Sequence, residues 1–98
     1  MLYYKGTTNG GNMKVRNNWV KITAEQGLLK LTKYQHDTYY DSEPRYIHLN
    51  LANVVFMEND GWKDNPTVTV AKGECHIVIS LSEEAFKKFE ELIFEQNT

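Results

Sequence analysis

Histidine and cysteine are the residue types in this chain that could provide catalysis or bind a metal. The sequence contains one cysteine, Cys75, and three histidines, His36, His48 and His76. Zinc sites usually show Cys-x-x-Cys or His-x-x-x-His spacing, and this sequence has neither. In a strand, Cys75 and His76 would point to opposite faces and could not share a metal. We therefore expect no metal site, a buried Cys75, and His48 and His76 either facing solvent or hydrogen-bonding across a sheet.

Other motifs that would indicate a cofactor or a nucleophile are incomplete. The acidic stretch Glu58–Asp64 contains a glycine but lacks the Asp-x-Asp-x-Asp-Gly order and the later bidentate Glu of a calcium loop. Gly10 and Gly11 are not followed by the Lys-Ser/Thr pair of a phosphate-binding loop, and no serine has a glycine-flanked nucleophile elbow. We therefore expect no cofactor, no catalytic residue and no enzymatic activity.

Aromatic residues in polar surroundings are the strongest candidates for a binding role. Four tyrosines fall within thirteen positions beside polar turn residues, and a tryptophan lies in a loop of Asn, Asp, Gly and Pro. Tyrosine is also common in ordinary strands, and the indole has the alternative of packing back onto the sheet edge. Because Trp and Tyr dominate many interfaces, we predict a partner-binding face. Its residues are Tyr39, Tyr40, Arg45, Tyr46 and Trp62.

Charge is nearly balanced over the whole chain but is unevenly distributed along it. The formal net charge is −2; residues 1–46 carry seven Lys/Arg and four Asp/Glu, and residues 47–98 carry four and nine. A dedicated duplex-DNA binder normally has a basic excess, because neutralising phosphates supplies much of its affinity. The balance therefore argues against nucleic acid as the main partner. The basic first half leaves one alternative open, a phospholipid, small-ligand or nucleic-acid binder that uses Lys14, Arg16, Lys21, Lys30 and Lys33.

The length of 98 residues fits a single domain. No stretch reaches the roughly 18 apolar residues of a transmembrane helix, and Met1–Gly6 lacks the basic and apolar regions of a secretory signal. A lone cysteine suits a reducing compartment. We therefore expect a cytoplasmic β-rich domain over residues 13–98, preceded by a hairpin arm or flexible lead-in over residues 1–12, where Asn9-Gly10 is a turn signal.

Alternation of apolar and polar residues predicts strands through the middle of the chain. Trp19–Ile22 is short and β-prone, and residues 25–27 form a plausible turn. Leu28–Tyr34 alternates, which would place Leu29 and Leu31 on the same face. Residues 37–44 are polar and rich in turn residues, so we expect a loop there, in which two tyrosines could form the end of a strand.

The alternation changes phase within residues 45–58. Ile47 and Leu49 share one parity, whereas Val54 and Phe56 share the other. A strand cannot change parity without turning its buried face outward, so we predict a break at Asn50–Asn53 with a strand on each side. Farther on, Thr67–Val70 and Cys75–Ile79 flank a short glycine-containing link and predict a hairpin.

The C-terminal segment predicts one amphipathic helix over residues 82–96, with Ser80 and Ser82 as candidate N-caps. Its apolar positions fall on one face, and they are Ala85, Phe86, Phe89, Leu92 and Ile93. Phe94 lies off that face, as a rim contact or a dimer contact. The fold class we predict is α+β: a small antiparallel sheet or β-barrel capped by this helix.

This order of elements resembles the pleckstrin-homology-like barrels, including the small bacterial and GRAM-type forms. Three stretches carry the resemblance: Gly27–Thr32, Ile47–Val55, and Cys75–Ile79 leading into the C-terminal helix. The resemblance implies a barrel and no shared chemistry, since members mostly bind phosphoinositides, peptides or other proteins. Members that bind phosphoinositides use a Lys/Arg cluster between the first two strands. Residues 23–27 of this chain hold one acid and no base, which argues against that ligand.

Taken together, these features predict a non-catalytic protein-interaction domain. Its partner would be another protein, and a second copy of the chain, forming a homodimer, is the other candidate. Lys outnumbers Arg nine to two, a composition typical of AT-rich bacteria and their phages. A phage or mobile-element protein that binds a host factor would fit this composition.

Overall fold

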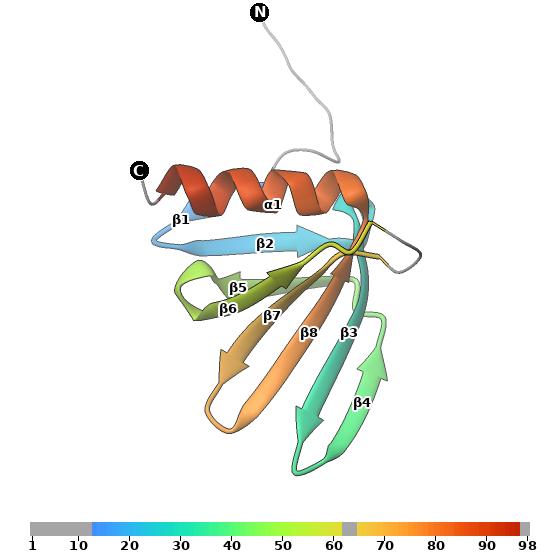
Figure 1. Cartoon of the computed structure of the whole chain (residues 1–98). Helices are drawn as coiled ribbons and strands as arrows, with labels where there is room; N and C mark the ends of the chain where they lie inside the picture. Colours follow the sequence, from blue (N-terminus) through green and yellow to red (C-terminus); the bar gives the residue numbers. More distant parts are fainter. Residues whose placement is uncertain (1–12, 62–64, 97–98) are drawn as a thin grey trace, which may run out of the picture.

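A computed structural model describes residues 13–61 and 65–96. Trp62 and the predicted arm over residues 1–12 lie outside the described residues. The described part contains two antiparallel sheets and a C-terminal helix, α1 (Glu83–Gln96), which lies across one end of both sheets (Figure 1). This arrangement confirms the predicted α+β class. The two sheets do not close into a barrel.

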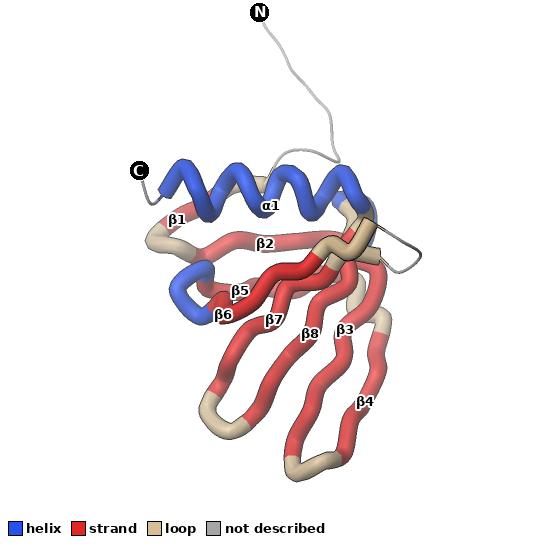
Figure 2. Tube along the Cα trace, in the orientation of Figure 1, coloured by secondary structure: helices blue, strands red, loops and turns tan. Residues whose placement is uncertain are grey.

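The smaller sheet has the order β1-β2-β5, and the larger sheet has the order β4-β3-β8-β7-β6. The smaller sheet consists of β1 (Val15–Arg16), β2 (Trp19–Thr23) and β5 (Tyr46–Asn50). The larger consists of β3 (Leu28–Gln35), β4 (Thr38–Ser42), β6 (Val54–Glu58), β7 (Thr67–Lys72) and β8 (Cys75–Leu81). Strands of the larger sheet fan out away from the helix, and their far hairpins extend beyond the smaller sheet (Figure 2).

Strand β4 lies where the sequence predicts a loop. The polar composition of residues 37–44 predicts mainly loop, with at most the end of a strand at the two tyrosines, but Thr38–Ser42 is a full strand that pairs with β3. The turn consists of only His36 and Asp37, whose φ angles are 52° and 67°. Positive φ at both central residues is typical of a two-residue hairpin turn. His-Asp is a weak signal for such a turn, and the polar composition of β4 is more typical of a loop than of a strand.

Two β-bulges correct the predicted alternation. In β3, Leu28 pairs with Leu81 and Lys30 pairs with Ser80, so Leu29 is the extra residue. Leu28 is therefore buried and Leu29 is 41% exposed, rather than sharing a face with Leu31. The same irregularity follows Val54 in β6. It turns Phe56 outward, with 56% of its surface exposed, where period-2 alternation predicts it inside.

The break predicted within residues 45–58 is confirmed. A single 3-10 turn, η4 (Leu51–Asn53), separates β5 from β6, and the Asn50 Oδ1 atom accepts a hydrogen bond from the Ala52 N–H at 2.9 Å. The strands on either side enter different sheets, because β5 pairs with β2 and β6 pairs with β7. The change of parity is therefore the point at which the chain changes sheet.

Of the two candidate N-caps, Ser82 is the one used. Its Oγ atom accepts a hydrogen bond from the Ala85 N–H at 3.2 Å, and its carbonyl accepts one from the Phe86 N–H at 2.9 Å. Ser80 lies in β8 opposite Lys30, so it does not cap the helix. The helix begins at Glu83.

One hydrophobic core joins the helix to both sheets. Its largest fully buried side chains include Phe89 from α1, Ile22 from β2 and Leu81 from β8, each with 0% exposure. Ala85 and Phe86 lie beside Phe89 in the same core. Burying each of the two phenylalanines Phe86 and Phe89 contributes about 1.5–3 kcal/mol, which ties α1 to the sheets.

Gly27 allows the chain to pass under the start of α1 as it leaves the smaller sheet. Its φ angle is 120°, and its carbonyl accepts a hydrogen bond from the Ser82 N–H at 2.9 Å. A Cβ atom at this position would lie 2.5 Å from the Ala85 Cβ and would also collide with the Ser82 Oγ. Glycine is therefore required here both for its backbone conformation and for lack of space.

Phe89→Ala should lower the free energy of unfolding by about 3–5 kcal/mol, because it leaves a cavity where the helix meets both sheets. Phe94→Ala is the matched control, since Phe94 is 62% exposed, and it should change that energy by no more than about 0.5 kcal/mol. Urea unfolding of both variants measures the difference. Equal effects would contradict the packing described here.

Gly27→Ala should lower the free energy of unfolding by about 2–4 kcal/mol, from backbone strain and overpacking together. Gly73→Ala is the comparison at a positive-φ glycine with open space around it. Gly73 also has positive φ, 61°, but nothing lies within 4 Å of its added Cβ, so strain alone should cost about 1–2 kcal/mol. The same urea measurement should rank Gly27→Ala as clearly the more destabilising. The opposite ranking would exclude the close contact with α1.

Candidate functional site

A cleft lies between the smaller sheet and the inner face of the larger one, with a cavity volume of about 260 Å³. We call it the inter-sheet cleft. The apolar lining from the larger sheet includes Leu31, Val70 and Ile77. The smaller sheet lines the cleft with Trp19 of β2 and with His48 and Asn50 of β5. The other lining residues are Ile47, Leu49, Asn53, Ala71, Lys72 and Ile79. Lys72 is the one charged side chain among the described residues that line it. The cleft therefore offers an apolar interior with a cationic group.

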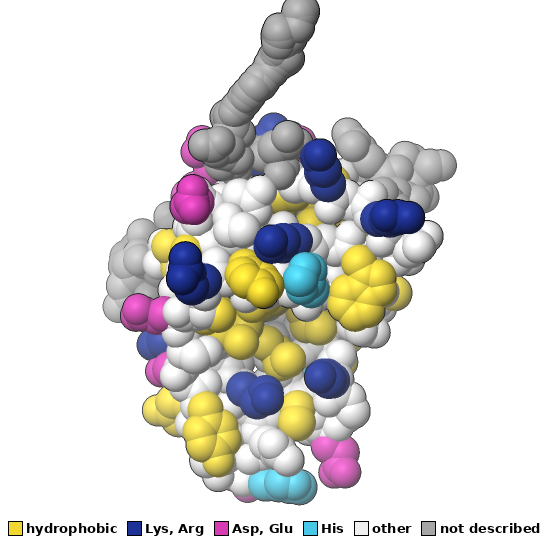
Figure 3. Space-filling view, turned by 180° about the vertical axis from the view of Figure 1, so that it is seen from behind, with side chains coloured by type: hydrophobic (Ala, Val, Ile, Leu, Met, Phe, Trp, Pro, Cys, Tyr) yellow, Lys and Arg dark blue, Asp and Glu magenta, His cyan; other side chains and the backbone are white. Residues whose placement is uncertain are grey.

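The pairing between the strands of the larger sheet shows which residues share its inner face. One cross-strand row runs Tyr40, Lys33, Ile77, Val70 and Val54 from β4 to β6. Towards the helix, this face is covered by the core, but at the far hairpins it is open. Seen from behind, apolar side chains occupy a hollow, with several Lys and Arg side chains around it (Figure 3).

The outer face of the smaller sheet carries aromatic and basic side chains next to the cleft. Alternation along β2 and β5 buries Val20, Ile22 and Leu49, and turns the residues between them outward. Lys21 Nζ lies 4.6 Å from the Tyr46 ring centroid, within the range of a cation–π contact.

The Tyr46 and His48 rings meet edge to face, with their centroids 5.5 Å apart. Trp19, at the start of β2, is 51% exposed. These three aromatic side chains share the outer face of the smaller sheet with Lys21. They provide exposed ring surface beside a cation, which suits recognition and includes no reactive pair.

The structure separates the residues that the sequence grouped into one binding face. Tyr46 lies beside His48 near the cleft, and Tyr40 lies on the inner face of the larger sheet opposite Lys33. Tyr39 points to the other face of β4, where its ring lies 5.8 Å from that of Tyr34. Adjacent residues of a strand point to opposite faces, so Tyr39 and Tyr40 do not share one.

Of the other two predicted site residues, Arg45 is exposed immediately before β5, and its backbone carbonyl accepts a hydrogen bond from the Ala24 N–H at 2.9 Å. Trp62 lies outside the described residues. His48 and His76 are exposed, as the alternation predicts. Cys75 is half-buried at the start of β8 instead of lying in the core.

The sequence reasoning missed Trp19 and Lys72. The alternation in β2 contained a signal for Trp19, because it shares parity with Lys21 and opposes the buried Val20 and Ile22. Lys72 had no such signal. It was assigned to the link of the predicted hairpin, whereas β7 extends to Lys72 and leaves a turn of only Gly73 and Glu74.

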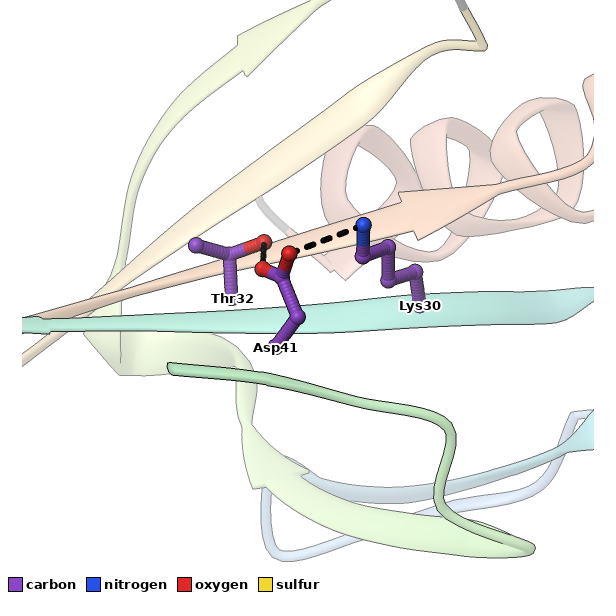
Figure 4. Close-up of polar contacts among 3 residues, drawn as sticks. All are labelled: Lys30, Thr32 and Asp41. Atoms are coloured by element: carbon purple, nitrogen blue, oxygen red, sulfur yellow. Dashed lines mark hydrogen bonds and ion pairs between the residues drawn. The ribbon is translucent and has the colours of Figure 1, made fainter. Parts of the chain in front are cut away.

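On the opposite, outer face of the larger sheet, Asp41 joins β4 to β3 (Figure 4). Lys30 Nζ lies 2.9 Å from Asp41 Oδ2, and the Thr32 hydroxyl donates a hydrogen bond to Asp41 Oδ1 at 2.8 Å. The contact with Lys30, followed by the Thr32 hydrogen bond, lowers the pKa of Asp41, and the contact with Asp41 raises the pKa of Lys30. Lys30 therefore faces the outer side of the larger sheet, whereas Lys33 faces the inner side. The basic residues predicted to bind a phospholipid, small ligand or nucleic acid consequently do not all lie on one surface.

No group of three His, Cys, Asp or Glu side chains within residues 13–61 and 65–96 could hold a metal ion. In the same stretches, no helix has the length and apolar content needed to span a membrane.

Removing the Lys30 ammonium should raise the pKa of Asp41 towards its ordinary value, because the ammonium stabilises the carboxylate. The depressed pKa means that this contribution to stability is present at neutral pH and is lost as the pH falls through the folded-state pKa. Lys30→Met should therefore make folding stability less sensitive to acid. NMR titration of the Asp41 carboxyl carbon in both proteins measures the shift. An unchanged pKa in Lys30→Met would show that the ion pair does not form in solution, and Thr32→Val isolates the smaller hydroxyl contribution.

Comparison of the chain with protein-family models, with curated proteins and with solved structures finds no match.

Proposed function

We propose that this chain is a non-catalytic protein-interaction domain that binds a segment of a partner protein in the inter-sheet cleft. The observation that carries the proposal is the cleft itself, apolar inside and bordered by the half-exposed indole of Trp19. Exposed aromatic side chains next to apolar hollows are typical anchors of protein interfaces. The resemblance to pleckstrin-homology-like domains supports the same role, since members of that family bind peptides and proteins.

Size also favours a segment of protein over a free metabolite. Small-molecule sites usually enclose about 300–1,000 Å³, and the cavity here, about 260 Å³, is smaller and open. It can accept a few apolar side chains while the rest of a partner lies along the exposed aromatic surface. A cytoplasmic partner, such as a host protein met by a phage or mobile-element product, is consistent with this proposal.

An amphiphilic anion is the second candidate ligand, and Lys72 is the specific observation that favours it. Its ammonium is next to an apolar interior, which suits a molecule with an acyl or aromatic body and a phosphate or carboxylate group. Such a ligand would bind much more weakly as the salt concentration rises, because its affinity would depend on charge.

Trp19→Ala should weaken capture of the partner from a lysate of the native cell by at least about tenfold, as loss of an interface tryptophan commonly does. Tyr39→Ala is the matched control, because Tyr39 is 63% exposed but lies on the face of the larger sheet away from the cleft. Quantitative mass spectrometry of the captured proteins measures both. Capture that survives Trp19→Ala and is lost in Tyr39→Ala would move the binding site to the opposite face.

A further inference from the structure

One edge of β5 has no strand partner among the described residues, and the hydrogen bonds between β2 and β5 show which backbone groups lie on that edge. At one end of the ladder the Ala24 N–H donates to the Arg45 carbonyl at 2.9 Å, and at the other the Leu51 N–H donates to the Asn18 carbonyl at 2.7 Å. Hydrogen-bonded and non-hydrogen-bonded pairs alternate along an antiparallel ladder. The residues of β5 that bond to β2 are therefore the odd-numbered ones.

The even-numbered residues of β5, Tyr46, His48 and Asn50, consequently direct their backbone N–H and C=O groups away from β2. β5 is the last strand of its sheet in the described chain, so no ladder there uses these groups. The Asn50 carbonyl is already engaged, because Asn50 is the N-cap of the 3-10 turn η4. Two of the three residues, His48 and Asn50, line the inter-sheet cleft. An open strand edge with regularly spaced donors and acceptors is a template for another strand.

The side chains around this edge specify what the added strand should carry. Residues paired across a ladder point to the same face, so ligand residues opposite Ile47 and Leu49 would point into the apolar cleft. Ligand residues opposite His48 would lie on the outer face, where Lys21 is its cross-strand neighbour. Lys72 adds a second cation, and no Asp or Glu of the described chain lines the cleft.

We propose that the free edge of β5 takes an additional antiparallel strand from a partner protein, an extended segment in which apolar residues alternate with acidic ones. The proposal rests on the proposed function and specifies the ligand of the same cleft. A second copy of this chain fits less well, because pairing β5 with β5 supplies no acidic residue from the added strand.

Antiparallel pairing with β5 also fixes which backbone groups of the ligand form the new ladder. A ligand residue opposite His48 is in a hydrogen-bonded pair with it, so its N–H points at β5 while its side chain points outward. The acidic residues of the segment therefore donate and accept the hydrogen bonds, and the apolar residues fill the cleft. Blocking the N–H groups of the acidic residues removes the ladder, whereas blocking those of the apolar residues leaves it intact.

The test uses the full chain and a synthetic probe, the N-acetylated and C-amidated peptide Glu-Val-Glu-Val-Glu-Val-Glu. Two matched probes carry N-methyl groups, one on its glutamates and one on its valines. NMR titration should show the unmethylated peptide shifting the amides of Tyr46, His48 and Asn50. Methylation of the glutamates should weaken binding by at least about tenfold, and methylation of the valines by less than about threefold.

Protein variants test the charge. Lys72→Glu should weaken binding of the unmethylated peptide by about fivefold or more at low salt, and Lys87→Glu, at an exposed position of α1, should leave it unchanged. A peptide with lysine in place of glutamate should bind more weakly to the unaltered chain.

Three outcomes would overturn the proposal. One is equal weakening by the two methylated probes, and another is the absence of binding at millimolar peptide. The third is a dimer of the chain alone in which the same three amides are protected, since a second copy would then be the occupant. If Trp19-dependent capture persists in the first two cases, the interaction function stands and only strand addition fails. Loss of that dependence would instead remove the proposed function.

Discussion

Burial of one face of α1 is the interaction on which the rest of the structure depends. No backbone ladder joins the two sheets within the described residues, so side-chain packing must hold them together. Phe89 provides that packing, with Ile22 of the smaller sheet and Leu81 of the larger sheet buried in the same core. The Ser82 cap and Gly27 place the first turn of the helix where these side chains meet.

Packing against α1 at one end of the larger sheet affects its opposite end, at the far hairpins. The helix lies across the sheets where β3 and β8 are most buried, and the strands of the larger sheet diverge from β5 as they leave it (Figure 2). The inner face of the larger sheet is consequently uncovered towards its far hairpins, where Tyr40 remains 61% exposed. The cleft is thus a product of the architecture: two sheets held together at the helix separate with distance from it.

Much of the fold follows from local sequence signals, and the reasons are visible in particular residues. The helix was predictable because its apolar positions repeat with the helical period. The break after Asn50 was predictable because a strand cannot change its buried parity. The bulges at Leu29 and Val55 were not, since a bulge inserts one residue without any distinctive composition.

The candidate site was less predictable than the fold. Tyr39 and Tyr40 are adjacent in sequence, and only the knowledge that β4 is a strand shows that they face opposite sides. Lys72 and His48 come from different sheets, so their shared cleft depends on the packing between those sheets, which no local pattern encodes. Binding residues brought together across sheets can be located only once the tertiary structure is known.

The short turns imply an order of assembly. β3 joins β4, and β7 joins β8, through two residues each, so these hairpins close small loops at little entropic cost. β3 and β4 lie between β2 and β5 in the chain, so pairing β5 with β2 closes a longer loop than either hairpin does. The pairing of β5 with β2 would accordingly form late, and a newly synthesised chain that has formed only its hairpins would not yet present the free edge of β5.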